Sequence, residues 1–218
     1  MLRRTFPGVT FGALVQVLGL DGVSIGEGTL VGDGTWLNVC SRATGSAISV
    51  GRCVQLGRYG MFNSGGSISI GDYCLFGPHV VVSNADHVID DVTRPYVDQG
   101  AHLGGRTVIG DNCWIAANVC ILGSLEIGRG SVIGAGSVIA RDVPPFAVVA
   151  GNPGRVAKLY NPLSERWERV ASEVERAVIF EARERAPLPD AETYRRQLAE
   201  RSATRTLPPE FAGNGVCY

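Results

Sequence analysis

The sequence has little net charge, few histidines and no long uninterrupted apolar run, and each shortage narrows the possible function. The formal net charge over 218 residues is −1, so the chain as a whole has no attraction to nucleic acid or to an anionic membrane surface. The apolar stretch from Val9 to Leu20 is interrupted by Gly12 and Gln16 and is too short to span a bilayer. We therefore expect no nucleic-acid partner and no stable membrane insertion.

The cysteines lack the spacing of a metal site or of a disulfide framework. Six are present, without a CxxC pair or a Cys/His cluster of zinc-binding spacing. A chain of this length also needs no disulfide to hold a core together. No small-residue cleavage site follows residues 9–20, so we expect no signal peptide. These features predict free thiols, no bound metal and a cytoplasmic protein.

What the sequence has in abundance is glycine, with 29 residues, and a strict period of six. Neither a helix nor a half-buried strand has this period, which is typical of a hexapeptide β-helix with one short strand and one corner per repeat. A chance apolar run in a parallel α/β sheet would not keep this phase. The isoleucines in phase are Ile109, Ile115, Ile121, Ile127, Ile133 and Ile139. A second inward position follows each by four residues and is mostly small, as a narrow interior requires: Cys113, Val119, Leu125, Ser131, Ser137 and Val143.

The same period predicts three earlier coils and locates the segments that depart from it. Their inward residues are Ile25, Val31 and Leu37, then Val50, Leu56 and Phe62, then Ile70, Phe76 and Val82. Residues 1–22 read as a lead-in that caps the first coil. Residues 88–106 have no hexapeptide phase, and an insertion at a solenoid corner is usually functional. We therefore predict an all-β solenoid over residues 1–160, with a protruding loop at 88–106.

The period changes to that of a helix near the C-terminus, which predicts a helical extension over residues 161–218. Ser164 is the expected N-cap. An apolar stripe follows at helical spacing: Trp167, Val170, Val174, Ala177 and Val178. Pro187 and Pro189 end this helix, and Asp190 begins a second short helix. Residues 206–218 read as a tail.

Among the three histidines, His87 has the position of a catalytic base. It stands at the last corner before the long loop, in the segment Ser83-Asn84-Ala85-Asp86-His87. Imidazole exchanges protons in both directions near neutral pH. A surface histidine at a turn is the alternative on placement alone. His79 is expected to be a satisfied surface group or a neighbour of the substrate, and His102 a solvated residue of the loop.

Several segments resemble the hexapeptide acyltransferases, and most closely the galactoside and maltose O-acetyltransferases and their glycan-acetylating relatives. The resemblance covers roughly residues 23–158 and is specific from residue 83 onward. The segments are Asn84-Ala85-Asp86-His87, Asp98-Gln99-Gly100, the residues 108–115, 133–138 and 142–145, and Ala150-Gly151-Asn152-Pro153-Gly154-Arg155-Val156. The resemblance implies a left-handed parallel β-helix, a homotrimer with active sites between protomers, acetyl-CoA as the acyl donor, and His87 as the general base.

The resemblance also implies roles for individual residues. Asn63 and Asp86 would bind the acceptor. Ala140 stands where threonine is commoner, and Arg141 replaces the usual lysine and would pair with phosphate equally well. The positions that would line the acyl donor are Trp114, Ala117, Ala135, Ala140, Arg141, Arg155 and Lys158.

We therefore predict an acetyl-CoA-dependent O-acetyltransferase that acts on a hydroxyl of a sugar or glycan precursor. The alternatives are N-acetylation of an amino-sugar and O-acetylation of a streptogramin-type antibiotic. Serine acetylation would require a long N-terminal helical domain, and a γ-class carbonic anhydrase would require three convergent zinc histidines. A non-enzymatic scaffold would be suggested by loss of the base, and His87 is present.

Overall fold

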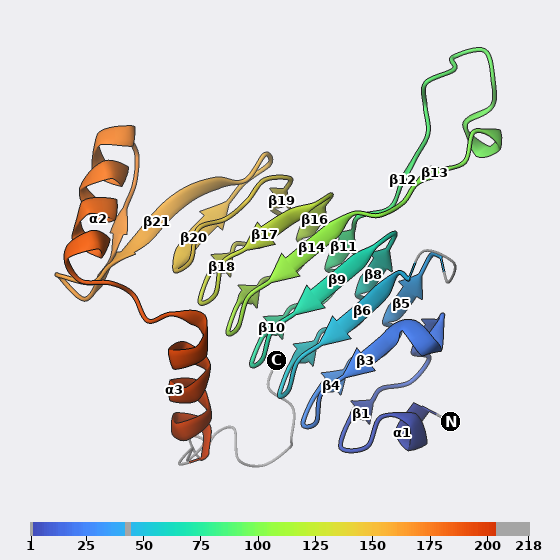
Figure 1. Cartoon of the computed structure of the whole chain (residues 1–218), viewed down its shortest axis with the longest axis horizontal. Helices are drawn as coiled ribbons and strands as arrows, with labels where there is room; N and C mark the ends of the chain where they lie inside the picture. The colour runs from blue at the N-terminus through green and yellow to red at the C-terminus, as the bar shows by residue number, and fades with distance from the viewer. Residues whose placement is uncertain (1, 42–44, 204–218) are drawn as a thin grey trace.

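The computed structural model describes residues 2–41 and 45–203, and within them a three-sided column of stacked coils forms the centre of the molecule (Figure 1). Each coil adds one strand to each of three parallel sheets, which we call A, B and C in the order in which a coil visits them. The register has no slip between coils; for example, Leu75 lies opposite Trp114 and Phe76 opposite Ile115. The predicted β-solenoid of parallel hexapeptide coils is thus what the chain forms.

The strands of each sheet come from successive coils. Sheet A contains β1 (Thr10–Phe11), β4 (Leu30–Val31), β7 (Gln55–Leu56), β10 (Leu75–Phe76), β15 (Trp114–Ile115), β18 (Val132–Ile133) and β20 (Ala147–Ala150). Sheet B contains β2 (Gln16–Leu18), β5 (Trp36–Val39), β8 (Met61–Ser64), β11 (Val81–Ser83), β16 (Cys120–Leu122) and β19 (Val138–Ile139). Sheet C contains β3 (Val23–Ile25), β6 (Ala47–Val50), β9 (Ser67–Ile70), β14 (Arg106–Ile109) and β17 (Leu125–Ile127).

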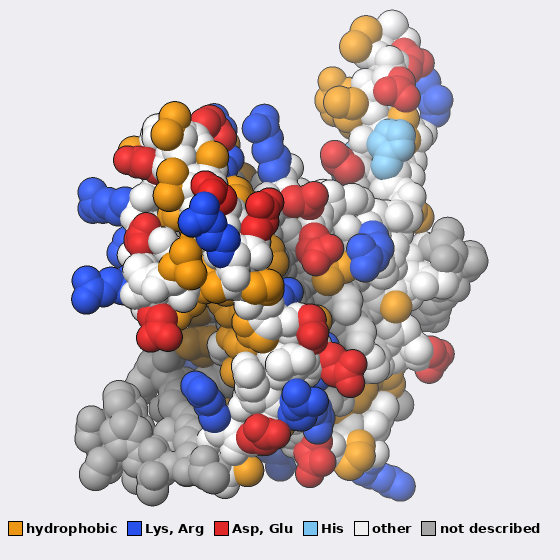
Figure 2. Space-filling model, turned by 60° about the vertical axis from the view of Figure 1, so that its left-hand side comes forward, with side chains coloured by type: hydrophobic (Ala, Val, Ile, Leu, Met, Phe, Trp, Pro, Cys, Tyr) orange, Lys and Arg blue, Asp and Glu red, His pale blue; other side chains and the backbone are white. Residues whose placement is uncertain are grey.

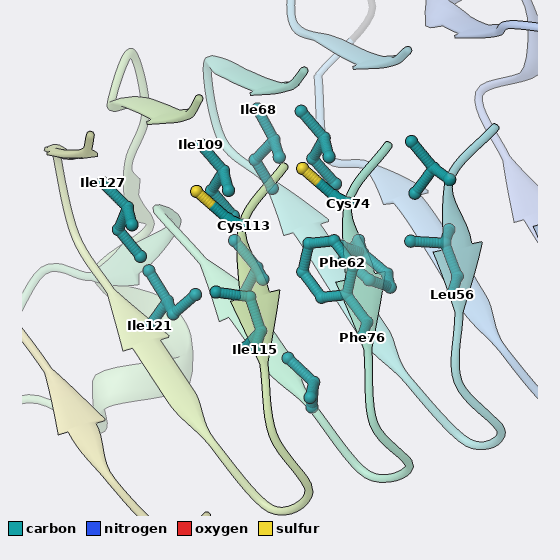
Figure 3. Packing of buried hydrophobic residues seen from close by; sticks show 14 of the residues in the cluster. Leu56, Phe62, Ile68, Cys74, Phe76, Ile109, Cys113, Ile115, Ile121 and Ile127 are labelled. Atoms are coloured by element: carbon teal, nitrogen blue, oxygen red, sulfur yellow. The ribbon is translucent and has the colours of Figure 1, made fainter. Parts of the chain in front are cut away.

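The interior of the column is filled by the side chains that the six-residue period selected. The isoleucines from Ile109 to Ile139 are all buried, at 0 to 3 % exposure. Figure 3 shows Ile109, Ile115, Ile121 and Ile127 facing the axis, with Cys74 and Cys113 beside them. Both thiols are free and buried, and the interaction with Cys113, together with burial, raises the pKa of Cys74. They therefore act as small apolar side chains, as predicted.

The corners are held by carboxylates and by glycines that allow close stacking. Asp111 Oδ1 accepts a hydrogen bond from the Asp72 N–H at 2.8 Å, and Asp72 Oδ1 accepts one from the Arg52 N–H at 2.8 Å. Each carboxylate thus satisfies a backbone donor of the coil before it. A Cβ on Gly57 would lie 2.2 Å from the carbonyl oxygen of Gly77. Glycine is therefore required there by the approach of the next coil.

The first coil begins earlier than the sequence indicated. Within the predicted lead-in, β1 pairs with β4 and β2 pairs with β5, so residues 10–25 form a coil of their own. The cover is instead α1 (Leu2–Thr5) and the segment after it, which buries Phe6 and Val9, while η1 (Leu20–Gly22) leads into β3. The period was hidden because Leu14, expected to be apolar cover, is an 83 % exposed corner residue with positive φ.

The loop predicted at residues 88–106 leaves the column as a two-stranded arm, but it starts slightly earlier. In this arm, residues 86–105, β12 (Asp86–His87) pairs antiparallel with β13 (Ala101–His102), and η2 (Tyr96–Asp98) lies near the tip (Figure 1). Buried Asn84 holds the base of the arm. Its side chain accepts from the Gly65 N–H and donates to the carbonyl of Gly105, where the chain returns to the column.

The first half of the predicted C-terminal helix is a strand. A hairpin of β21 (Arg155–Asn161) and β22 (Arg166–Arg169) extends sheet A antiparallel to β20, and the expected boundary at residue 160/161 falls inside β21. Trp167 packs edge-on against Tyr160 across the hairpin. Ser164, the expected N-cap, donates instead to the carboxylate of Glu168. Cross-strand pairing thus overrode a helical pattern that Trp167 shared by chance.

The helix itself, α2 (Glu173–Arg185), begins eight residues later than the helix expected after an N-cap at Ser164, with Ser172 and Glu175 as a reciprocal capping box. Its buried residues are Ile179 and Ala182, whereas Val174 and Val178 of the predicted stripe are exposed. Figure 2 shows apolar side chains between charged ones on the face of the molecule that carries this extension.

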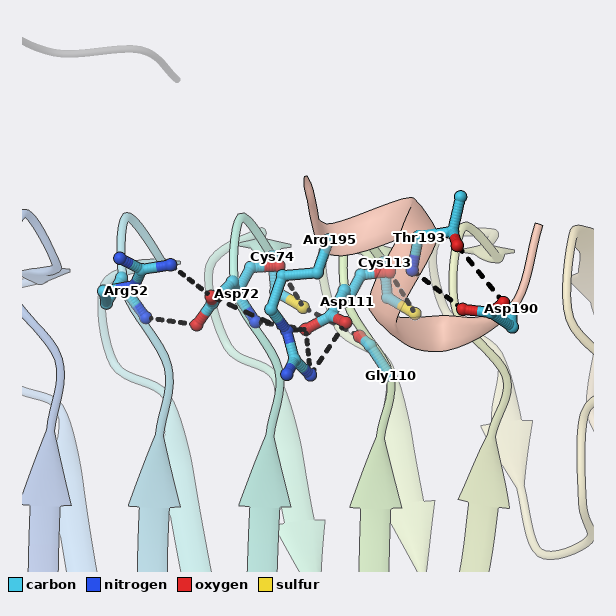
Figure 4. Close-up of polar contacts among 9 residues, drawn as sticks. All are labelled: Arg52, Asp72, Cys74, Gly110, Asp111, Cys113, Asp190, Thr193 and Arg195. Carbon is cyan, nitrogen blue, oxygen red and sulfur yellow. Dashed lines mark hydrogen bonds and ion pairs between the residues drawn. The ribbon is translucent and has the colours of Figure 1, made fainter. Parts of the chain in front are cut away.

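A second helix, α3 (Ala191–Ala203), confirms the expected start near Asp190 and packs on the corner where coils pass from sheet C to sheet A. Arg195 bonds both oxygens of Asp111 and lies 3.8 Å from Asp72 (Figure 4). The Asp111 carboxylate raises the pKa of Arg195. The Tyr194 hydroxyl is 2.6 Å from the side-chain nitrogen of Asn112. The tail predicted at residues 206–218 lies outside the described residues.

No helix in the described ranges has the length and apolar character needed to cross a membrane.

Candidate active site

His87 is exposed at the base of the arm, where β12 leaves the column. Its backbone N–H donates to the carboxylate of Asp86 at 2.8 Å, so the carboxylate is held back against the main chain. His87 lies opposite Ala101 in the ribbon, and Asp86 opposite His102. The small partner at residue 101 leaves the imidazole open to a ligand or to a neighbouring protein.

A row of outward side chains on sheet B connects the predicted acceptor site to the predicted donor site. Asn63 lies opposite Ser83 and Ser83 opposite Leu122, and the register of β16 with β19 continues this row to Ala140. Because adjacent strands are about 4.8 Å apart, Asn63 and Ala140 are separated by about 14 Å along the column. The arm with His87 leaves this edge beside Ser83, between the two ends.

The far end of this row opens into a small basic cleft. The turn at residues 150–154 packs back on β19, where the Gly154 N–H donates to the Val138 carbonyl. This turn brings Arg155 to Ala140 and Arg141, and the three line one cavity of about 80 Å³. Lys158 is exposed on β21, three residues further on. Two arginines thus line this cavity together with Asp142, and an arginine side chain is suited to pair with the phosphates of a nucleotide.

The other predicted donor residues lie on a different side of the column. Trp114 is 51 % exposed on the outer face of sheet A. Ala117 and Ala135 are neighbours at the corner between sheets A and B, where the Gly136 N–H donates to the Ala117 carbonyl at 3.0 Å. The predicted site is therefore divided within one chain: Asn63, Asp86, His87 and the basic cleft share one edge, whereas Trp114, Ala117 and Ala135 do not.

Three polar residues beside Asn63 were not predicted from the sequence to belong to the site. Asn38 donates to Asn63 Oδ1 at 2.7 Å, the Cys40 thiol lies 3.0 Å from the same oxygen, and Ser83 accepts from Asn63 at 3.4 Å. The hexapeptide period does contain information about two of these residues. Asn38, Asn63 and Ser83 each directly follow the inward residue of a sheet B strand, so the period alone predicts that they share a row.

Within residues 2–41 and 45–203, no group of three His, Cys, Asp or Glu side chains is arranged to hold a metal ion.

Comparison with known proteins confirms the resemblance to hexapeptide-repeat transferases. Residues 106–141 match the family model described as bacterial transferase hexapeptide (six repeats). The galactoside O-acetyltransferase of Escherichia coli K12 is 34 % identical over 125 residues, which cover 55 % of this chain and 60 % of that protein. The chain spans about half the length of the curated relatives it matches, for example 43 % and 44 % of two of them.

Solved structures share the fold. A maltose O-acetyltransferase from Clostridium difficile 630 has a TM-score of 0.50 and 28 % identity, over 71 % of this chain and 70 % of that chain. An N-acyltransferase from Bacillus cereus, solved with dTDP and 3-hydroxybutyryl-CoA, has a TM-score of 0.61 at 17 % identity, over 82 % and 92 %. The chain is thus similar to hexapeptide-repeat acetyltransferases, and this likeness implies a left-handed β-helix.

Proposed function

We propose that the protein is an acetyl-CoA-dependent O-acetyltransferase that acts on a hydroxyl of a sugar or glycan precursor. The observation that carries this proposal is the row on sheet B, which joins Asn63, the arm with His87 and the basic cleft at Arg141 and Arg155. The galactoside and maltose O-acetyltransferases among the relatives support the same reaction class.

The arrangement favours direct transfer with His87 as the base. In its neutral form the imidazole accepts the proton of the acceptor hydroxyl as the oxygen attacks the thioester carbonyl. The resulting imidazolium returns the proton to the departing thiolate. Holding both substrates on one edge of the column supplies much of the rate, so no acyl-enzyme is needed. Arg141, Arg155 and Lys158 would hold the phosphates of the donor, while Ala140 leaves room for its approach.

A homotrimer would complete the divided site, and the outer faces of the column support it. Sheet C presents Ser24, Ser49 and Ser69 in one row, whereas sheet A presents Leu30, Leu75 and Trp114 beside a largely apolar groove of about 420 Å³. The arm exposes Ile89, Val92, Tyr96 and Val97. A neighbouring protomer that covered sheet A with its arm would bring its own His87 toward Trp114.

The remaining parts of the proposal follow the sequence. We assign the acyltransferase domain to residues 1–160 and the extension to residues 161–218, with the qualification that β21 and β22 join the extension to sheet A. Cytoplasmic location is proposed from the free thiols.

Release of free coenzyme A thiol from acetyl-CoA, measured with galactosides, maltose, amino-sugars and streptogramins in turn, tests the function. We expect turnover with a neutral sugar, and we expect His87→Ala to lower it by about 10²-fold or more because the base is lost. A preference for an amino-sugar would favour the N-acetyltransferase alternative, and turnover only with a streptogramin would favour antibiotic inactivation.

His79→Ala is the matched control. His79 is an exposed histidine that stacks on Tyr59 at the corner between sheets A and B, away from the arm, so its loss should lower turnover far less than the loss of His87. Full activity of His87→Ala would remove His87 from the mechanism.

A further inference from the structure

The side chain of Asn63 has two neighbours on the coil before it, and both meet the same oxygen. Asn63 Oδ1 accepts from Asn38 Nδ2 at 2.7 Å and lies 3.0 Å from Cys40 Sγ. Asn38 Nδ2 is also 3.5 Å from Cys40 Sγ, so its two hydrogens serve the sulfur and the Asn63 oxygen. The amide oxygen of Asn63 is therefore turned toward the N-terminal end of the column.

The Cys40 thiol acts as a donor in this arrangement. Partial burial raises the pKa of the thiol, which favours the protonated form that can donate. A thiol hydrogen between the sulfur and Asn63 Oδ1 gives that oxygen a second donor. Two donors on one side of an amide fix which end is oxygen and which is nitrogen.

The nitrogen of Asn63 consequently faces Ser83 and the arm. Its contact with the Ser83 oxygen is long, at 3.4 Å, and the Ser83 hydroxyl itself donates to the Ala85 carbonyl at 3.3 Å. The half-buried amide group thus presents its N–H donors on the side where His87 leaves the column. Such donors recognise an oxygen lone pair, as on a neutral hydroxyl, and not a protonated amine, which has no acceptor.

We propose that Asn38 and Cys40 are positioning residues, which hold the Asn63 amide with its nitrogen toward the arm so that it binds the oxygen of a neutral acceptor. This inference rests on the proposed function, because it assigns Asn63 to the acceptor. It adds two residues to the site and a chemical preference for hydroxyl over ammonium.

Steady-state kinetics with the best galactoside acceptor, together with calorimetric binding of that sugar in the presence of coenzyme A, test the proposal. Cys40→Ala and Asn38→Ala should each raise the acceptor KM and Kd about fivefold, as expected for one lost hydrogen bond. Both values should rise by more in the double variant, while the donor KM stays constant. Cys40→Ser, which keeps a donor, should restore acceptor affinity to near the wild-type value.

Thermal unfolding of each variant identifies any loss of folding, and Cys53→Ala, at another exposed free thiol, is the matched control. An active wild type whose double variant keeps the acceptor KM would overturn the positioning role alone. Equal changes in both KM values, without rescue by serine, would also overturn it. If the wild type binds the sugar but transfers no acetyl group, the proposed reaction is wrong. The sugar Kd values of the variants would still decide whether Asn38 and Cys40 position Asn63. A wild type that neither binds nor acetylates any sugar would contradict both.

Discussion

The column and helix α3 of the C-terminal extension are held in place by different forces. In the column each coil buries an apolar side chain at every sixth residue, and Ile115, Ile121 and Ile127 are fully buried. In the extension α3 has no buried residue, and Arg195 and Tyr194 connect it to the corner through polar contacts. Burial of apolar area stabilises in proportion to that area, whereas an ion pair whose arginine is half exposed, as Arg195 is, stabilises less. The column should therefore stay folded under conditions that already release α3.

The largest effect should come from a cavity inside the column. Ile127→Ala removes a fully buried side chain of β17 that neighbouring coils cannot collapse around, and we expect a loss of about 2–5 kcal/mol in the free energy of unfolding. Denaturant unfolding measures it. Glu126→Ala, at the exposed neighbour on the same strand, should change stability by no more than about 0.5 kcal/mol. Equal losses from both variants would contradict the inward and outward alternation.

The column could be predicted because its sequence is periodic, and the period indicates which residues face inward. Each coil repeats the same environment, so a residue such as Phe62 or Val82 could be placed inside by counting alone. The basic cleft was less accessible, because Arg155 reaches Ala140 only through the turn at residues 150–154. The resemblance pointed to these residues, but the sequence gives no distance between them.

The extension was predicted less well because no repeat constrains it. Trp167 fits a helical stripe as well as it fits a strand, and only the pairing of β22 with β21 decides between them. Arg195 is 84 residues from Asp111, and nothing local to either residue indicates the contact. The two carboxylates beside Arg195 belong to corners with a Gly-Asp pair, and such pairs recur in the sequence. The corners could therefore have been predicted, but not that Arg195 would bind them.

A smaller effect is expected from releasing α3. Arg195→Ala removes the ion pair with Asp111, and because Arg195 is half exposed we expect a local loss of about 1 kcal/mol. Amide hydrogen exchange in residues 191–203 should become faster, while the column strands keep their protection. Once α3 has moved away, water can solvate Asp111, so its burial adds no large penalty.

Arg196→Ala is the control for α3, since it removes the next exposed arginine of the same helix. It should leave the exchange of residues 191–203 unchanged. Faster exchange throughout the column in Arg195→Ala would mean that the contact between Arg195 and Asp111 also stabilises the core, and would refute the distinction between the column and α3.

The smallest effect should come from the N-cap of α2. This prediction distinguishes the observed N-cap, Ser172, from the N-cap expected from the sequence, Ser164. Ser172 accepts from the Glu175 N–H, and Glu175 accepts from the N–H groups of Ala171 and Ser172. Ser172→Ala should lower the local stability of α2 by about 1 kcal/mol, which amide exchange in residues 173–185 would report.

The matched variant Ser164→Ala should leave that exchange unchanged, because the hydroxyl of Ser164 donates to Glu168 in the hairpin.

The capping box of α2 also makes the stability of the helix depend on pH. Hydrogen bonds from Ala171 and Ser172 lower the pKa of Glu175, so its contribution is present above the ordinary glutamate range and is lost as the pH falls through the lowered pKa. In Ser172→Ala the backbone bonds to Glu175 remain, and acid should still loosen the helix. If amide exchange in α2 became faster in Ser164→Ala and not in Ser172→Ala, the helix would begin after Ser164, as the sequence pattern predicted.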